Sequence, residues 1–316
     1  IAVDRQKIRD TLATFTNIED AIMGATGLNY FDEHRDGQKT VSLGVYKNRN
    51  YVSALTQLQV MRSASEIADL DEALKDERVL LINDKHMYRT NVVYTGIDFR
   101  DITNLNIKDL TCTLDFYIWF RFQGNFKPED IEFVNAINSQ EIREQLASEP
   151  VAKKTKDKIT YRLYHIHSQF KADFLNENAF KQHVLGVKFR HRNLTRHNLI
   201  YVTDDLGMGL SANDNLATRL KQNQVLNPLL GWTINRVLFF PDIAKKSSLG
   251  DPKYLNAIDG LVEYSQFNAA IRIERADFTF RNQIPYQYSY KLMALSTLIL
   301  FLLTLASRKV QRHLKY

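Results

Sequence analysis

Several stretches of the chain alternate apolar and polar side chains residue by residue, which is the pattern of a strand with one buried face. The clearest one covers residues 111–122 (TCTLDFYIWFRF). We expect its even positions, Cys112 to Phe120, to face a core, and Thr113, Asp115, Tyr117, Trp119 and Arg121 to lie on the other face. This stretch is the strongest strand prediction in the chain.

Other strands are predicted along the same part of the chain, separated by turn residues. They cover residues 91–99, 159–167, 184–191, 199–202, 233–240 and 264–280. One helix is expected at residues 138–147, where Asn138 is placed as N-cap and Glu141 as its capping-box partner. Many short strands at this spacing predict an antiparallel β-sandwich over residues 87–284.

The first 86 residues show a different pattern. Residues 4–15 have apolar side chains at helical spacing, and a second short helix is expected from Asn17 or Glu19 to Gly24. Val41, Leu43 and Val45 alternate as in a strand, whereas residues 51–58 fit a strand or a helix. A strand at residues 79–82 is followed by the polar stretch 83–90, which is too short for a flexible tether between two parts.

An uncharged run of fifteen residues, 292–306 (LMALSTLILFLLTLA), lies near the C-terminus. Tyr288 and Lys291 precede it and Arg308 and Lys309 follow it, as expected of membrane anchors. The pattern predicts a transmembrane helix at residues 285–307 and a basic cytoplasmic tail at 308–316. The alternative is an apolar helix that packs on the folded part.

Composition narrows the classes of function. The 316 residues carry 42 Lys and Arg against 36 Asp and Glu, and the net charge of +6 is dispersed except at the C-terminus. We therefore expect no nucleic-acid partner. The single cysteine, Cys112, lies on a predicted core strand, so neither a disulfide within the chain nor a reactive thiol is expected.

The sequence contains few residues in arrangements typical of catalysis or metal binding. No Ser-His-Asp spacing, Gly-rich phosphate loop or paired-carboxylate motif is present, so we expect no enzyme, no catalytic residue and no cofactor. His165 and His167 share one strand face and are weak metal candidates, with a pair of exposed histidines as the simpler interpretation. Asp204 and Asp205 belong either to a calcium site or to a polar turn. Asp115 is expected to form an ion pair with Arg121 and Arg100.

Residues 24–58 resemble the last part of a leucine/branched-chain amino-acid type of periplasmic binding domain. The matching residues are Gly24, Gly27, Phe31, Asp32, Arg35, Asp36 and Gly37. The resemblance implies that residues 1–86 are the C-terminal part of such an α/β domain, present either as a fragment or as a packing element. It also suggests a small solute, such as an amino acid, as a ligand.

Residues 89–280 resemble the extracellular β-sandwich of prokaryotic pentameric ligand-gated ion channels. The matching residues are Val93, Gly96, Ile97, Ile102, Thr111, Asp115, Tyr117, Trp119 and Arg121. Residues 170–191 resemble the loop of that family that faces the membrane, which implies a coupling role for Phe174, Phe180, Lys181 and His183. Tyr117, Trp119 and Arg121 are candidate ligand-binding residues, as part of an aromatic box for a cation or, alternatively, as sheet packing.

The expected fold class is thus α+β: a partial α/β periplasmic-binding-type lobe, an antiparallel β-sandwich and one C-terminal transmembrane helix. We expect a ligand-sensing receptor in the bacterial inner membrane, with its bulk on the periplasmic side and its C-terminus in the cytoplasm. The expected partners are the lipid bilayer and either further copies of the chain or partner membrane subunits. A channel-like subunit and a structural anchor are the alternatives.

Overall fold

The structure is a computed structural model that describes most of the chain. The described residues are 4–17, 21–24, 27–31, 35, 37–39, 42–47, 50–61, 64–67, 69–106, 108–172, 182–210, 215–254, 261–276, 291 and 293–304. They belong to two compact units, residues 1–227 with 233–274 and residues 228–232 with 275–316. The first unit holds the sheets described below.

The larger sheet has seven strands in the order β11-β12-β9-β8-β14, with β6 and β7 paired to the first part of β8. All of its pairings are antiparallel except that of β14 with β8. The strand bounds are β6 (Thr56–Val60), β7 (Val79–Ile82), β8 (Lys85–Asn106), β9 (Thr111–Gln123), β11 (Ala152–Lys156), β12 (Ile159–Lys171) and β14 (Leu199–Thr203). The strands predicted at 91–99, 111–122, 159–167 and 199–202 are therefore confirmed.

The second sheet has four strands in the order β10-β13-β16-β15. Their bounds are β10 (Ile131–Phe133), β13 (Gln182–His191), β15 (Trp232–Ser247) and β16 (Leu261–Arg275). β13 and β16 are antiparallel from the pair Gln182 and Glu274 to the pair Arg190 and Gln266. These strands contain most of the remaining predicted ones, although β16 ends at Arg275 and residues 277–280 lie outside the described part.

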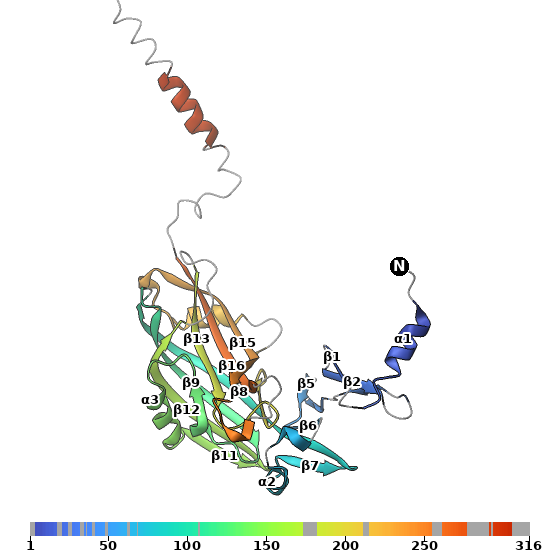
Figure 1. Ribbon diagram of the computed structural model, residues 1–316. Coiled ribbons are helices and arrows are strands. Elements are labelled where there is room, and N and C mark those ends of the chain that lie inside the picture. Colours follow the sequence, from blue (N-terminus) through green and yellow to red (C-terminus); the bar gives the residue numbers. More distant parts are fainter. Residues whose placement is uncertain are drawn as a thin grey trace, which may run out of the picture. The chain divides into compact units, whose positions relative to one another are not determined.

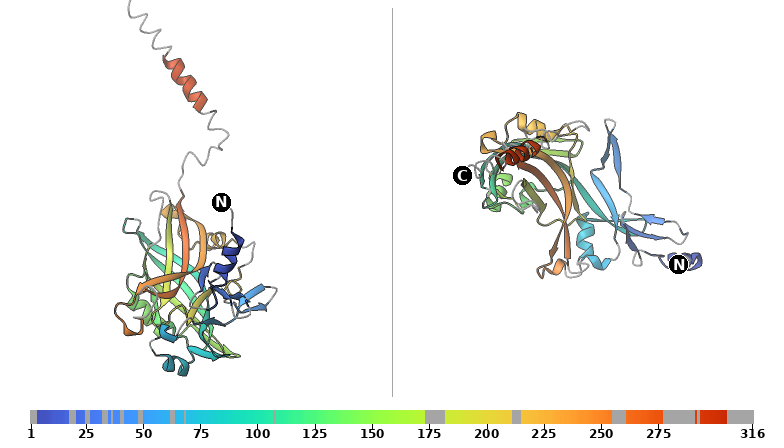
Figure 2. Two further views of the ribbon diagram at one scale, coloured as in Figure 1. Left: turned by 45° about the vertical axis from the view of Figure 1, so that its right-hand side comes forward. Right: turned by 90° about the horizontal axis from the view of Figure 1, so that it is seen from above.

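Aromatic rings from both sheets meet in one core. Figure 1 and Figure 2 show the course of the strands that carry these rings. The even positions of β9 from Cys112 to Phe120 are fully buried, as the alternation predicts. Phe189 of β13 packs edge-on against Phe120 of β9 at 6.2 Å and against Tyr201 of β14 at 5.1 Å between ring centroids. Since burying one such side chain contributes about 1.5–3 kcal/mol, these rings hold the two sheets face to face as a sandwich.

Short helices fill the connections. In α3 (Ser139–Ala147) the Asn138 side chain accepts a hydrogen bond from the Glu141 amide, and Ile142 and Leu146 are buried, so the helix predicted at 138–147 is confirmed. The other α-helices are α1 (Arg5–Leu12), α2 (Leu70–Lys75) and α4 (Leu216–Gln222). Single 3₁₀ turns are η1 (Ala64–Glu66), η2 (Pro128–Asp130), η3 (Pro228–Leu230) and η4 (Pro252–Tyr254).

The N-terminal segment is β-rich, so the predicted α/β lobe is wrong for the residues described there. Its strands β1 (Ile22–Gly24), β2 (Gly27–Phe31) and β3 (Gly37–Lys39) form an antiparallel sheet, and β4 (Gly44–Lys47) pairs with β5 (Asn50–Ser53). The last residues of the helix expected to end at Gly24 are instead strand β1, because Gly24 pairs with Gly27 at the end of a hairpin. Residues 51–58, left open between strand and helix, are strand in β5 and β6 apart from two connecting residues.

The polar stretch after residue 82 is not a linker. Asn83 and Asp84 have φ angles of 48° and 59° and make the tight turn between β7 and β8, where Ile82 pairs with Lys85. Asn and Asp suit such a turn because they tolerate the left-handed conformation. The predicted boundary between residues 86 and 87 therefore lies inside β8, a continuous strand of 22 residues.

The predicted transmembrane helix at residues 285–307 is also wrong. Of its residues, 291 and 293–304 are described, and 293–304 are helical. Among the described residues, no helix combines the length and the apolar character that a bilayer span requires. Of the predicted membrane anchors, Lys291 is described, whereas Tyr288, Arg308 and Lys309 lie outside the described residues.

The buried histidine at the end of β13 predicts a loss of stability in acid. Nδ1 of His191 accepts hydrogen bonds from the Asn193 and Leu194 amides at 3.1 and 3.0 Å, and burial lowers the pKa of His191 to about 4. Since the unfolded pKa is near 6.5, the neutral ring stabilises the fold fully above pH 6.5. That stabilisation is lost as the pH falls toward 4, at up to about 1.4 kcal/mol per pH unit.

Urea unfolding at pH 7 and pH 5 measures this effect. We expect His191 to account for about 2 kcal/mol of the loss between the two, so His191→Asn, whose side chain still offers an acceptor, should lose clearly less than the wild type. His167→Asn, at an exposed position, is the matched control and should keep the wild-type difference. An unchanged difference in His191→Asn would contradict the assignment.

Candidate functional site

The outer face of the seven-stranded sheet brings together the predicted ligand-binding residues. Tyr117, Trp119 and Arg121 are half-buried and lie in successive rows of β9. Tyr117 pairs with Asp98 of β8 and His165 of β12, and Arg121 pairs with Tyr94 and Tyr161 in the same way. Aromatic, cationic and acidic side chains thus alternate across three strands, and we call this area the outer surface.

A buried carboxylate holds one end of the outer surface. Asp204 follows β14 directly, and its side chain is 4% exposed. Its oxygens accept hydrogen bonds from Trp119 Nε1 at 3.1 Å and from Arg121 Nη2 at 2.6 Å. The Gly207 amide donates to the same carboxylate at 3.3 Å, which closes the turn after the strand. Trp119 and Arg121 are therefore fixed by one charged acceptor.

The indole ring of Trp119 requires a glycine beside it. Gly96 is its cross-strand neighbour on β8, and a Cβ atom at Gly96 would lie 2.1 Å from Cζ2 of Trp119. The ring therefore covers backbone, where any side chain would push it away. On the next row the Arg121 guanidinium lies 4.5 Å from the centroid of the Tyr94 ring, within the range of a cation–π interaction.

Burial beside this cluster keeps two phenols protonated. Burial raises the pKa of Tyr94, Asp204 raises it further, and Arg121 opposes them. Burial and then Asp204 also raise the pKa of Tyr161. Both hydroxyls therefore remain neutral at physiological pH, and that of Tyr94 donates a hydrogen bond to the carbonyl of Ser53.

The predicted ion pair of Asp115 with Arg121 and Arg100 is wrong. Arg121 pairs with Asp204, and Arg100 Nη1 lies 3.5 Å from the Asp98 carboxylate. The oxygens of Asp115 instead lie 2.8 Å from His165 Nε2 and 3.2 Å from His167 Nδ1. These partners depend on the register between β9 and β12, which the sequence alone does not reveal.

The metal candidates gain no support. His165 and His167 do share one strand face, but one carboxylate engages both, and Asp204 is used by Trp119, Arg121 and a turn amide. In the part of the chain that the structure describes, no group of three or more His, Cys, Asp or Glu side chains is arranged to hold a metal ion. The polar-turn interpretation of Asp204 is therefore the better one.

The remaining predicted residues lie elsewhere. His183 is 5% exposed on β13, where it pairs with Ile273, and burial lowers its pKa. It is thus a core residue, whereas Phe174, Phe180 and Lys181 of the same predicted loop lie outside the described residues. Cys112 is fully buried, and burial raises the pKa of its thiol to about 12, so it stays protonated.

Removing the carboxylate tests whether it organises the outer surface. We expect Asp204→Ala to lower the free energy of unfolding by about 2–3 kcal/mol, because it leaves Arg121 and the Trp119 N–H without their acceptor. Tryptophan fluorescence, recorded in a Trp232→Phe background, should shift at the same time. Urea titration followed by fluorescence measures both effects.

The neighbouring carboxylate provides the control. Burial and Asp204 raise the pKa of Asp205, so its ionised form is disfavoured in the folded chain. Asp205→Ala should therefore be neutral or slightly stabilising at pH 7. Equal destabilisation by both variants would show that Asp204 has no special role.

Comparisons with protein-family models and with curated proteins found no match to this chain. Both resemblances stated from the sequence therefore stay predictions. The candidate site rests on the geometry of the outer surface alone.

Proposed function

We propose that this chain is the recognition part of a ligand-sensing receptor, and that the outer surface binds a small organic cation. The observation that carries the proposal is the position of Arg100, whose guanidinium carbon lies 6.0 Å from the centroid of the Tyr117 ring. The chain's own cation thus occupies the place over the aromatic face that a ligand cation would take.

The resident cation is held weakly. The Arg100 side chain is 58% exposed, and its contact with Asp98 is long at 3.5 Å, so the pair contributes little stability. A ligand ammonium group that replaced Arg100 would gain the Tyr117 face together with the carboxylate of Asp98. The His165 ring, 4.9 Å from that of Tyr117, supports the other side of the site.

The surroundings of this position are rigid, which lowers the entropic cost of binding. Asp204 fixes Trp119 and Arg121 on the adjoining rows. Asp98 also belongs to β8, which pairs with β6 and β7 in its first part and with β9 from Tyr94 onward. A ligand-driven shift of β8 would therefore reach the strands that precede the sandwich in the chain, which is how a receptor could pass on a binding signal.

Calorimetric titration with tetramethylammonium and choline at constant ionic strength tests the proposal. We expect binding by the wild type and a loss of about two- to fivefold in affinity in Tyr117→Leu. Arg100→Gln should bind more tightly than the wild type, because the competing cation is removed. Lys221→Gln, a charge loss on the exposed surface of α4, is the matched control and should bind as the wild type does.

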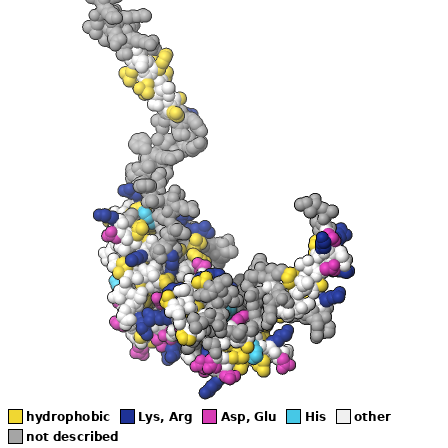
Figure 3. All heavy atoms as spheres, in the orientation of Figure 1, with side chains coloured by type: hydrophobic (Ala, Val, Ile, Leu, Met, Phe, Trp, Pro, Cys, Tyr) yellow, Lys and Arg dark blue, Asp and Glu magenta, His cyan; other side chains and the backbone are white. Residues whose placement is uncertain are grey.

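An affinity in Arg100→Gln equal to or lower than that of the wild type would contradict the displacement of Arg100. Equal affinities in Tyr117→Leu and the wild type would exclude the aromatic face. The surface in Figure 3 makes nonspecific attraction of cations a poor alternative, because basic and acidic side chains are interspersed over the face it shows.

A further inference from the structure

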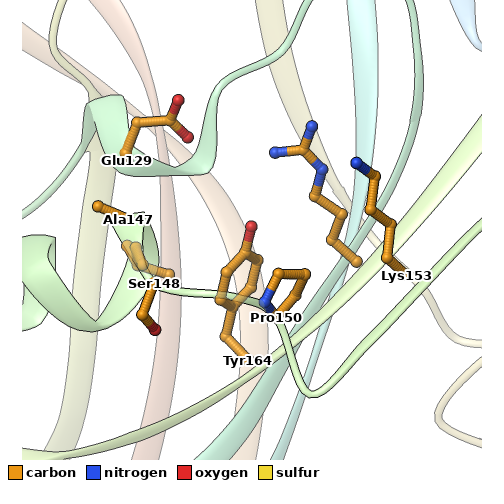
Figure 4. Close-up of a pocket in the computed structure, with 8 residues that line it drawn as sticks. Glu129, Ala147, Ser148, Pro150, Lys153 and Tyr164 are labelled. Atoms are coloured by element: carbon orange, nitrogen blue, oxygen red, sulfur yellow. The ribbon is translucent and has the colours of Figure 1, made fainter.

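A cavity of about 250 Å³ lies where the end of α3 meets β11 and β12 (Figure 4). Its lining includes Glu129 of η2, Ser148 and Pro150 after α3, Lys153 of β11, and Arg162 and Tyr164 of β12. In Figure 4, Glu129 and Lys153 lie on opposite sides of this space, and Tyr164 rises between them. Sites for drug-sized ligands hold roughly 300–1,000 Å³, so this cavity suits a smaller molecule.

Two cations lie side by side on one wall. Lys153 and Arg162 are direct cross-strand partners in the β11–β12 pair and point to the same face of the sheet. Like charges in this position repel each other. Within the described residues, neither cation forms a salt bridge, and Glu129 does not approach either within 4.0 Å. The described part of the chain therefore supplies no counter-ion for this pair.

Arg162 is held in place with an unused donor. Its guanidinium carbon lies 5.8 Å from the centroid of the Phe122 ring, within the range of a cation–π interaction. Its Nε, however, is buried and has no hydrogen-bond partner among the described residues. Buried donors are nearly always paired, so Arg162 keeps hydrogen-bonding capacity that the described residues do not use.

The opposite wall has the reverse polarity. Glu129 contributes a carboxylate, and Ser148 is the C-cap of α3, where the last carbonyl groups carry the negative end of the helix dipole. A simple anion would be repelled by this wall, and a simple cation by Lys153 and Arg162. A molecule with both charges fits both walls.

We propose that this cavity binds a free amino acid, with its carboxylate on Arg162 and Lys153 and its ammonium group toward Glu129 and the C-terminal end of α3. Arg162 suits the carboxylate because a guanidinium offers two parallel donors. The cavity lies on the inner side of β12, because Arg162 and Tyr164 alternate with the outward-facing Tyr161 and His165. This site is therefore separate from the outer surface and does not depend on it.

Calorimetric titration of the full 316-residue chain at pH 7 tests the proposal with the standard amino acids, acetate, methylammonium and inorganic phosphate. We expect at least one amino acid to bind at least about tenfold more tightly than acetate or methylammonium. Arg162→Gln should weaken that binding by at least about tenfold. Lys153→Gln, at an exposed position where the fold is not at risk, should weaken it in the same direction.

Glu129→Gln tests the contribution of the acidic wall separately from that of the two cations. It should weaken binding of the amino acid while leaving acetate binding unchanged or stronger, because it removes the partner of the ammonium group and a repelling charge together. The control is Lys154→Gln, which removes the next charge of β11 from the opposite face and should bind as the wild type does.

Binding of no amino acid, or equal weakening by Lys154→Gln and Lys153→Gln, would overturn the proposal. Binding of acetate or phosphate as tightly as any amino acid would also overturn it, because the cavity would then be a plain anion site. Weakening by both cavity cations together with the selective effect of Glu129→Gln would support it.

Discussion

The packing of aromatic rings between the two sheets is the constraint on which the rest of this structure depends. Phe189 alone meets Phe120 and Tyr201 of the seven-stranded sheet and Phe133 and Phe267 of its own sheet. Rings of this size leave no tolerance for a slip of register, because a shift by one residue would turn every buried ring toward solvent. The core therefore decides which side chains of each strand remain outside.

Both proposed sites depend on which side chains the core packing leaves on the outer and inner faces. Because the even positions of β9 are buried, Asp115, Tyr117, Trp119 and Arg121 must share the outer face, where β8 and β12 add their own outward side chains. On β12 the same alternation sends His165 outward and Arg162 inward, toward the cavity near α3. One strand thus contributes to the surface proposed to bind a cation on one side and to the cavity proposed to bind an amino acid on the other.

The spacing of apolar residues and the helix-capping residues were enough to predict the elements that depend on neighbouring residues in the chain. The alternation in residues 111–122 identified β9 and both of its faces, and Asn138 with Glu141 marked the start of α3. Partners across strands were not predictable in the same way. Asp115 was assigned to arginines but contacts two histidines of β12, since register decides which charges meet.

Other predictions failed for equally physical reasons. Ile22–Gly24, expected as the end of a helix, form a strand because the pairing of Gly24 with Gly27 outweighs weak helical spacing. The uncharged run at residues 292–306 predicted a membrane span at 285–307, but none of the helices among the described residues has the length and apolar character that a span requires. The sequence analysis does not predict that Asp204 holds Trp119 and Arg121, or that Gly96 leaves room for the Trp119 ring. An Asp directly after a strand and a Gly within a strand are the sequence features that could have indicated these roles.

The most direct test of the account compares two adjacent residues of β9. Phe116 is fully buried between the sheets and Tyr117 lies on the outer surface, so a charged side chain should be tolerated only at the second position. We expect Phe116→Lys to lower the free energy of unfolding by more than about 4 kcal/mol or to prevent folding, and Tyr117→Lys to change it by less than about 1 kcal/mol. Similar losses in the two variants, or a larger loss in Tyr117→Lys, would contradict the assignment of the two faces.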